Sequence, residues 1–124
     1  MHQEWQLFTW HPHGILDDDR ADEMLDVLEL EEVSSDQQFN RYADFTQLSS
    51  IRLKIGHVFQ IADRRRDAPL SVKSAFFADT VVGFGVARLY ESLMEDACLE
   101  VRAFSDRNAA AAWLGVPLKV LLPK

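Results

Sequence analysis

Aromatic and aliphatic residues gather in short runs along the chain, and stretches of helical periodicity separate these runs. Residues 5–10, Trp-Gln-Leu-Phe-Thr-Trp, have the composition of a strand, which Pro12 and Gly14 then end. The next apolar positions predict a helix of about three turns that begins after Asp17, a suitable N-cap. They are Ala21, Met24, Leu25 and Leu28.

Three more strands are expected in the remainder of the chain, over residues 39–46, 72–78 and 99–104. Residues 47–50 are polar and are expected to form a loop. Residues 51–55 alternate apolar and basic side chains, a pattern that fits either a short strand or the entry to a helix.

Each later strand is followed by a helical pattern. The first of these helices ends near the run Arg64-Arg65-Arg66, where basic residues suit the negative end of the helix dipole. The second follows the cap candidates Asp79 and Thr80 and has its apolar stripe at Val82, Val86, Leu89, Tyr90 and Leu93. The third is short, begins after Asp106, and ends at Gly115 in a left-handed conformation.

Strand and helix thus alternate four times with short connections. This pattern predicts an α/β fold of repeated βα units, with a mixed, mostly parallel sheet of four to five strands and about four helices. A chain of 124 residues is the size of one domain, so we expect a single domain over residues 1–124.

The tail after Pro117 is apolar but carries no helix signal. Its apolar residues are Val116, Leu118, Val120, Leu121 and Leu122. Left in water, they would form a patch of the kind that marks association. The tail is therefore expected to add an edge strand to its own sheet or to pack on a second copy, and we favour a two-fold homodimer.

Composition narrows the class of protein. With 48% hydrophobic and 27% charged residues, the chain reads as a soluble globular protein, without a membrane-spanning run or a secretory signal. The lone Cys98 allows no internal disulfide and suits a reducing, cytoplasmic location; we expect it to be a buried small apolar residue. The net charge of −7 argues against nucleic acid as a partner.

The acidic residues are concentrated near the start of the chain. Residues 1–40 hold eleven of the 20 acidic residues and a single base, Arg20. The charges at Asp22, Glu23, Asp26 and Glu29 share the face of the first helix that we expect to point toward water. Over the whole molecule, we expect this acidic helix to fold against the basic second half.

Motifs for catalysis are sparse. His11 and His13, close to three aspartates at 17–19, form the most metal-like group, but those aspartates are also explained as helix-start acids. The glycines Gly83 and Gly85 lack the rest of a dinucleotide fingerprint and fit close helix–sheet packing better. We expect no enzyme activity and no cofactor.

Three segments of the second half carry a family resemblance. Residues 76–93 (Phe-Phe-Ala-Asp-Thr through Gly-Val-Ala-Arg-Leu-Tyr-Glu-Ser-Leu), 99–106 (Leu-Glu-Val-Arg-Ala-Phe-Ser-Asp) and 112–115 (Ala-Trp-Leu-Gly) resemble the SpoIIAA-like (STAS/SEC14-related) proteins. The resemblance implies the small βα fold of anti-sigma-factor antagonists.

The resemblance also bears on activity. Antagonists of this fold carry a phosphorylatable serine in a turn that falls here on residues 51–56, where no serine stands; Ser49 and Ser50 lie earlier and do not inherit the role. The SEC14-related branch implies a small apolar ligand held between helix and sheet.

A ligand of an open parallel sheet is expected outside the carboxyl ends of the strands. Arg88 could bind an anion there, although an ion pair with Glu91 or Asp96 explains it more simply. The candidate ligand-binding residues are His11, His13, Phe77, Asp79, Thr80, Phe84, Arg88 and Asp106.

The sequence therefore favours a non-enzymatic binding module of the STAS-like fold, acting through protein contacts or a small apolar ligand. The alternative is a metal-dependent or ligand-transforming enzyme that uses the His11/His13 region.

Overall fold

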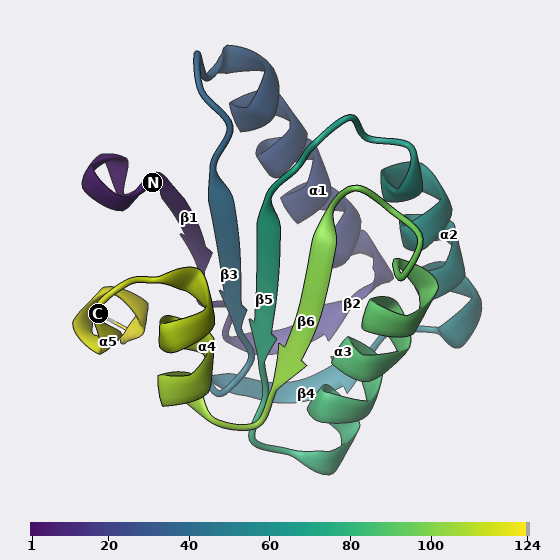
Figure 1. The fold of residues 1–124 in the computed structure, drawn as a ribbon. Helices are drawn as coiled ribbons and strands as arrows, with labels where there is room; N and C mark the ends of the chain where they lie inside the picture. Colours follow the sequence, from purple (N-terminus) through teal and green to yellow (C-terminus); the bar gives the residue numbers. More distant parts are fainter. Residues whose placement is uncertain (124) are drawn as a thin grey trace.

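Four parallel strands form the main sheet of the computed structural model, which describes residues 1–123. They are β1 (Leu7–Trp10), β3 (Asn40–Asp44), β5 (Lys73–Phe77) and β6 (Glu100–Phe104), and they lie in the order β1-β3-β5-β6 (Figure 1). The repeated βα pattern predicted this parallel α/β sheet correctly. The expected domain covers residues 1–124, of which Lys124 lies outside the described residues.

A second, two-stranded sheet departs from the prediction. Strands β2 (Gly14–Asp17) and β4 (Leu48–Arg52) pair in parallel near the carboxyl ends of the main strands (Figure 1). The loop expected over residues 47–50 was therefore wrong for residues 48–50, because a half-exposed strand at the surface carries polar side chains such as Ser49. On the partner strand, Leu16 is almost fully buried.

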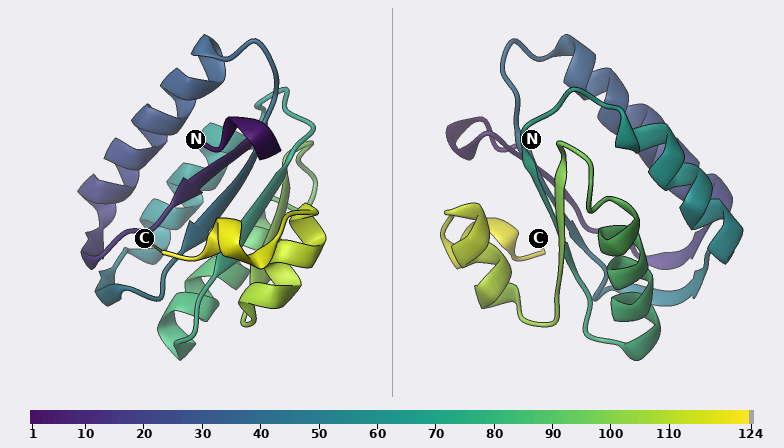
Figure 2. Two further views of the ribbon diagram at one scale, coloured as in Figure 1. Left: turned by 90° about the vertical axis from the view of Figure 1, so that its left-hand side faces the viewer. Right: turned by 45° about the vertical axis from the view of Figure 1, so that its right-hand side comes forward.

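The helices cover the two faces of the main sheet unequally. Helices α1 (Asp18–Ser34), α2 (Ile55–Arg66) and α3 (Val81–Leu93) lie on one face, and α4 (Arg107–Leu114) and α5 (Leu118–Leu121) lie on the other (Figure 2). None of the helices described is long and apolar enough to cross a membrane.

Side chains at three expected positions cap these helices. The side chain of Asp17 accepts a hydrogen bond from the amide of Arg20, and that of Asp106 accepts one from Asn108. Thr80, not its neighbour Asp79, caps α3 by accepting from the amide of Gly83. Each cap satisfies an amide that the first turn of a helix leaves without a partner.

Gly83 allows α3 to approach the sheet closely. A Cβ atom built at this position would lie 3.0 Å from the Cβ of Ala78 and 2.9 Å from the hydroxyl of Thr80. The prediction of close packing is thus confirmed for Gly83. It is wrong for Gly85, where a Cβ would meet nothing within 4 Å.

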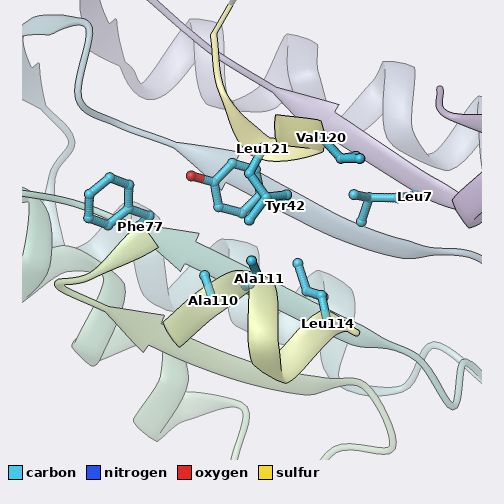
Figure 3. Close-up of a cluster of buried hydrophobic side chains, with 9 residues drawn as sticks. Leu7, Tyr42, Phe77, Ala110, Ala111, Leu114, Val120 and Leu121 are labelled. Carbon is cyan, nitrogen blue, oxygen red and sulfur yellow. The ribbon is translucent and has the colours of Figure 1, made fainter. Parts of the chain in front are cut away.

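The C-terminal tail folds as the short helix α5, contrary to the expectation of no helix. Val120 and Leu121 are buried in the core cluster between the sheet and α4, where they pack with Leu7, Tyr42 and Leu114 (Figure 3). Pro117 precedes the first turn, where its missing amide costs nothing. The tail is therefore neither an edge strand nor a free apolar patch, and it gives no argument for a homodimer.

Gly115 ends α4 in the left-handed conformation that the sequence predicted, with φ of 72°. Its amide bonds back to the last turn of the helix. We expect Gly115→Val to lower the free energy of unfolding by about 1 kcal/mol or more, since a branched side chain disfavours positive φ. Urea unfolding would measure this loss; an unchanged midpoint would contradict the assigned role of this residue.

Candidate functional site

An apolar cavity lies between the main sheet and helices α1, α2 and α3. Its volume is about 120 Å³. The sheet contributes two rows of side chains that face these helices, because alternate residues of a strand point to the same face. The row nearer the carboxyl ends contains Trp10, Ala43 and Phe76, and the row nearer the amino ends contains Phe8, Arg41 and Ser74.

Helix α1 covers the cavity without packing tightly on the sheet. Among its 17 residues only Ala21 is buried, at 9% exposure. Met24, Leu25 and Leu28 line the cavity and remain half-buried. The helix was expected to have about three turns; it is longer, and its outward positions include the exposed Val27, Leu30 and Val33.

Polar contacts between side chains attach α1 to α2. Asp22 lies 2.8 Å from the Nε2 atom of His57, and Arg64 binds both Asp26 and Glu29. The acidic helix therefore folds against the basic second half, as expected. The prediction that the face of Asp22, Glu23, Asp26 and Glu29 points toward water fits the exposed Glu23. It was wrong for the other three, because His57 and Arg64 of α2 bind them.

A buried ionic cluster stands at the end of α1, beside the cavity. Glu32 binds Arg41 of β3 at 2.5 Å and Arg65 of α2 at 2.6 Å. The side chains of Arg41 and Arg65 are only 6% and 3% exposed. Arg65 belongs to the basic last turn of α2, as the sequence predicted, and it is buried because it lies on the inner face of the helix with Val58 and Ala62. One carboxylate thus joins a strand and two helices.

Opposing effects set the pKa of Glu32. Burial raises it, but the hydrogen bonds from Arg65 and Arg41 outweigh burial and hold the pKa below its usual range. Burial lowers the pKa of Arg41, and the bond to Glu32 opposes that shift. Both groups are therefore charged at neutral pH, since the arginine guanidinium stays protonated in proteins.

A second buried carboxylate, Asp44, lies on the other face of the sheet. It is 1% exposed and accepts hydrogen bonds from the Tyr42 hydroxyl at 2.7 Å, the Thr46 hydroxyl at 2.6 Å and Arg107 Nε at 3.0 Å. Burial raises its pKa, but the bonds from Thr46, Tyr42 and Arg107 outweigh burial and lower it overall. Burial together with Asp44 raises the pKa of Tyr42 well above its ordinary value. Asp44 thus receives its hydrogen bonds from side chains of the protein, which favours a structural role for this network.

These two carboxylates predict acid sensitivity. Because the folded-state pKa values of Glu32 and Asp44 lie below their ordinary values of 4.5 and 3.8, the unfolded chain binds more protons between the folded and unfolded values. Their contribution to stability is present above about pH 4.5 and is lost as the pH falls through the folded values. We expect urea midpoints to drop on acidification below that range. The drop should be smaller in Glu32→Gln, and an equal drop would contradict this assignment.

The two histidines predicted as ligands do not form a site together. His11 Nε2 lies 2.9 Å from the carbonyl oxygen of Leu121, and its ring meets that of Tyr42, so it attaches α5 to the sheet. His13 is exposed, and its carbonyl accepts from Arg20. Within residues 1–123, no three His, Cys, Asp or Glu side chains are grouped to hold a metal ion.

The other predicted residues are divided between the two faces of the sheet. Phe77 is buried against α4 under the Arg107 guanidinium, whereas Phe84 packs on the α1–α3 side. Thr80 and Asp106 act as helix caps, and Asp79 is exposed. Arg88 pairs with Glu91 at 3.3 Å, the simpler explanation given above.

Two further expectations concern reactive side chains. Cys98 is exposed, so the prediction of a buried residue was wrong; it stands in the turn before β6. No serine begins α2, which starts Ile-Gly-His, and Ser49 and Ser50 lie within β4. The turn over residues 51–56, where the resemblance places the phosphorylated serine of the antagonists, thus contains no serine.

The sequence did not single out Arg41, Glu32 or Asp44. A signal was present, since Arg41 and Asp44 are charged residues among the apolar and aromatic side chains of the segment from Phe39 to Phe45. A charged side chain in such a run is buried only when it is paired. The identity of the partners depends on how α1 and α2 cross the sheet.

Comparison with known proteins identifies the fold. No family model matches the sequence, and no curated protein matches it either. The structure is similar to that of an uncharacterized protein from the DUF3478 family of Shewanella loihica PV-4, described as having a SpoIIAA-like fold. The TM-score is 0.55 at 16% identity, over 86% of this chain and 81% of that chain. The parallel sheet with helices on both faces is thus a SpoIIAA-like fold, as the sequence segments suggested.

Proposed function

We propose that this protein is a non-enzymatic binding module that holds a small apolar ligand between its sheet and helix α1. The observation that carries the proposal is the cavity of about 120 Å³, walled by Trp10, Phe76 and Leu25. Engineered cavities of about 150 Å³ with such walls bind benzene. A ligand of similar size, six or seven carbon atoms, suits this cavity.

The attachment of α1 supports ligand entry. Its ion pairs of Arg64 with Asp26 and Glu29 are exposed and weak, and Ala21 is its one buried residue, so displacing its first turns, away from the buried Glu32 cluster, costs less than opening a packed core helix. A helix attached in this way admits a ligand to a cavity whose other walls are the main sheet and helices α2 and α3.

The competing proposals have less support. The metal-dependent enzyme that would use His11 and His13 lacks a third ligand among the described residues. A homodimer loses its main argument because Val120 and Leu121 pack within the chain. A cytoplasmic location remains part of our proposal, on the ground that a single cysteine, Cys98, suits a reducing compartment.

The test measures the binding of two uncharged probes, toluene and 1-hexanol. Binding is monitored by the change of amide chemical shifts in nuclear magnetic resonance spectra. We expect saturable shifts at Ala43 and Phe76, with Kd on the order of 0.1–1 mM for ligands with so few atoms.

A cavity-filling variant provides the matched comparison. Ala87 of α3 is 2% exposed and lines the cavity, so Ala87→Leu should fill the space and abolish probe binding. Ala112→Leu makes the same change on the exposed surface of α4 and should leave binding intact. If Ala87→Leu binds the probes as the wild type does, the ligand is not held in this cavity.

A further inference from the structure

The amino-end row of the cavity differs in chemistry from the rest of its wall. Arg41 and Ser74 are register partners on adjacent parallel strands, so their side chains stand side by side on the cavity face. Both residues are buried, at 5% and 4% exposure. Arg65 and Tyr90 line the cavity from α2 and α3. The cavity therefore has an apolar part and one end that carries hydrogen-bond donors.

The Arg41 side chain has an unsatisfied donor. Its Nη1 donates to Glu32 and its Nη2 to the carbonyl of Phe39, and its guanidinium stacks on the Phe39 ring at 4.7 Å. The Nε atom is buried and has no hydrogen-bond partner among the described residues. A buried donor of a charged group without an acceptor is unfavourable, so an acceptor placed there by a ligand is bound favourably.

The charges around Arg41 are also out of balance. Among the described residues, the buried cluster sets two guanidinium groups, Arg41 and Arg65, against the single carboxylate of Glu32. Glu29 also reaches Arg65, at 3.2 Å, but it is one-third exposed and is shared with Arg64. A buried excess of positive charge favours an anion.

The neighbouring hydroxyl groups suit the same kind of ligand. Burial raises the pKa of Tyr90 to about 12, so its hydroxyl is neutral and can donate. Ser74 can donate as well. An ionised carboxylate accepts hydrogen bonds only, and it forms strong charge-assisted bonds with arginine.

We propose that the ligand is a small amphipathic carboxylate, with its hydrocarbon part against Trp10, Ala43 and Phe76 and its carboxylate oxygens accepting from Arg41 Nε. This inference rests on the proposed function and specifies the class of ligand. The cavity volume sets the size at about that of hexanoate, so a longer chain requires α1 to move outward.

Three ligands with the same six-carbon chain test the head group on the wild-type protein: hexanoate, 1-hexanol and hexylammonium. We expect hexanoate to bind at least about tenfold more tightly than 1-hexanol, because the charge-assisted bond to Arg41 adds to the apolar contact. Hexylammonium should bind more weakly than either. Equal binding of hexanoate and 1-hexanol would overturn the carboxylate inference and leave the proposed function standing. If none of the three binds, both proposals fail.

The variant Arg41→Met locates the effect. It should remove the preference for hexanoate over 1-hexanol. Arg88→Met removes an exposed arginine of α3 and should leave this preference unchanged. A hexanoate preference that survives Arg41→Met would assign the anion to another residue. If Arg41→Met does not fold, nuclear Overhauser contacts between the hexanoate methyl group and the Phe76 ring on the wild type locate the ligand, and their absence counts against this site.

Discussion

Replacing Asp44 with alanine is expected to lower the free energy of unfolding by about 3 kcal/mol or more. The substitution leaves the Tyr42 hydroxyl without its acceptor and the Arg107 guanidinium without its carboxylate, in a place where Asp44 itself is 1% exposed. Removing one partner of a buried ion pair costs about 3–5 kcal/mol, because the other charge stays behind uncompensated. Arg107 is 23% exposed and recovers part of this through water, so the lower end of the range applies.

Asp106→Ala is the matched control for this measurement. It removes an exposed carboxylate that caps α4, for which a loss of about 1 kcal/mol is expected. Urea unfolding monitored by circular dichroism would compare the two variants. Equal losses would show that the network around Asp44 adds nothing beyond one ordinary hydrogen bond.

Leu121→Ala should be about as damaging, with a loss of about 3 kcal/mol. Leu121 is 0% exposed in the cluster with Tyr42 and Leu114, and a cavity left by a buried leucine costs about 2–5 kcal/mol. Its carbonyl oxygen also accepts a hydrogen bond from His11 Nε2, which attaches α5 to the rest of the protein.

Leu118→Ala in the same short helix serves as the comparison. Leu118 is 36% exposed, so this variant should lose less than about 1 kcal/mol of the free energy of unfolding. Light scattering on the same samples would detect any change in subunit number. If the tail instead held two copies together, Leu121→Ala would lower the subunit number in light scattering and would leave the melting temperature nearly unchanged.

Local signals were sufficient for much of the fold. The caps Asp17, Thr80 and Asp106 and the stop at Gly115 depend on side chains within a few residues, so a single sequence carries the information. Strand β2, the first part of β4 and helix α5 were missed because distant partners stabilise them: β2 and β4 pair with each other, and α5 packs on Leu7 and Tyr42.

The site was harder to predict than the fold. The residues expected to bind a ligand lay at the carboxyl ends of the strands, whereas the cavity lies under α1 and has its donors near the amino ends, at Arg41 and Ser74. Its polar end is formed by side chains that lie as far apart in the sequence as Arg41 and Tyr90. They come together only because three helices cross the sheet. The apolar ligand between helix and sheet, suggested by the resemblance, is the part of the expectation that our proposal retains.

The packing of Leu7 against Val120 and Leu121 has a consequence for the order of folding. Contacts between residues more than one hundred positions apart raise the contact order, and domains rich in such contacts fold slowly. On the ribosome, the α1–α3 side of the sheet has all its strands once residue 104 has emerged. The opposite side must wait for residue 121, and until then the strand faces that bear Leu7 and Tyr42 stay open to solvent and to chaperones.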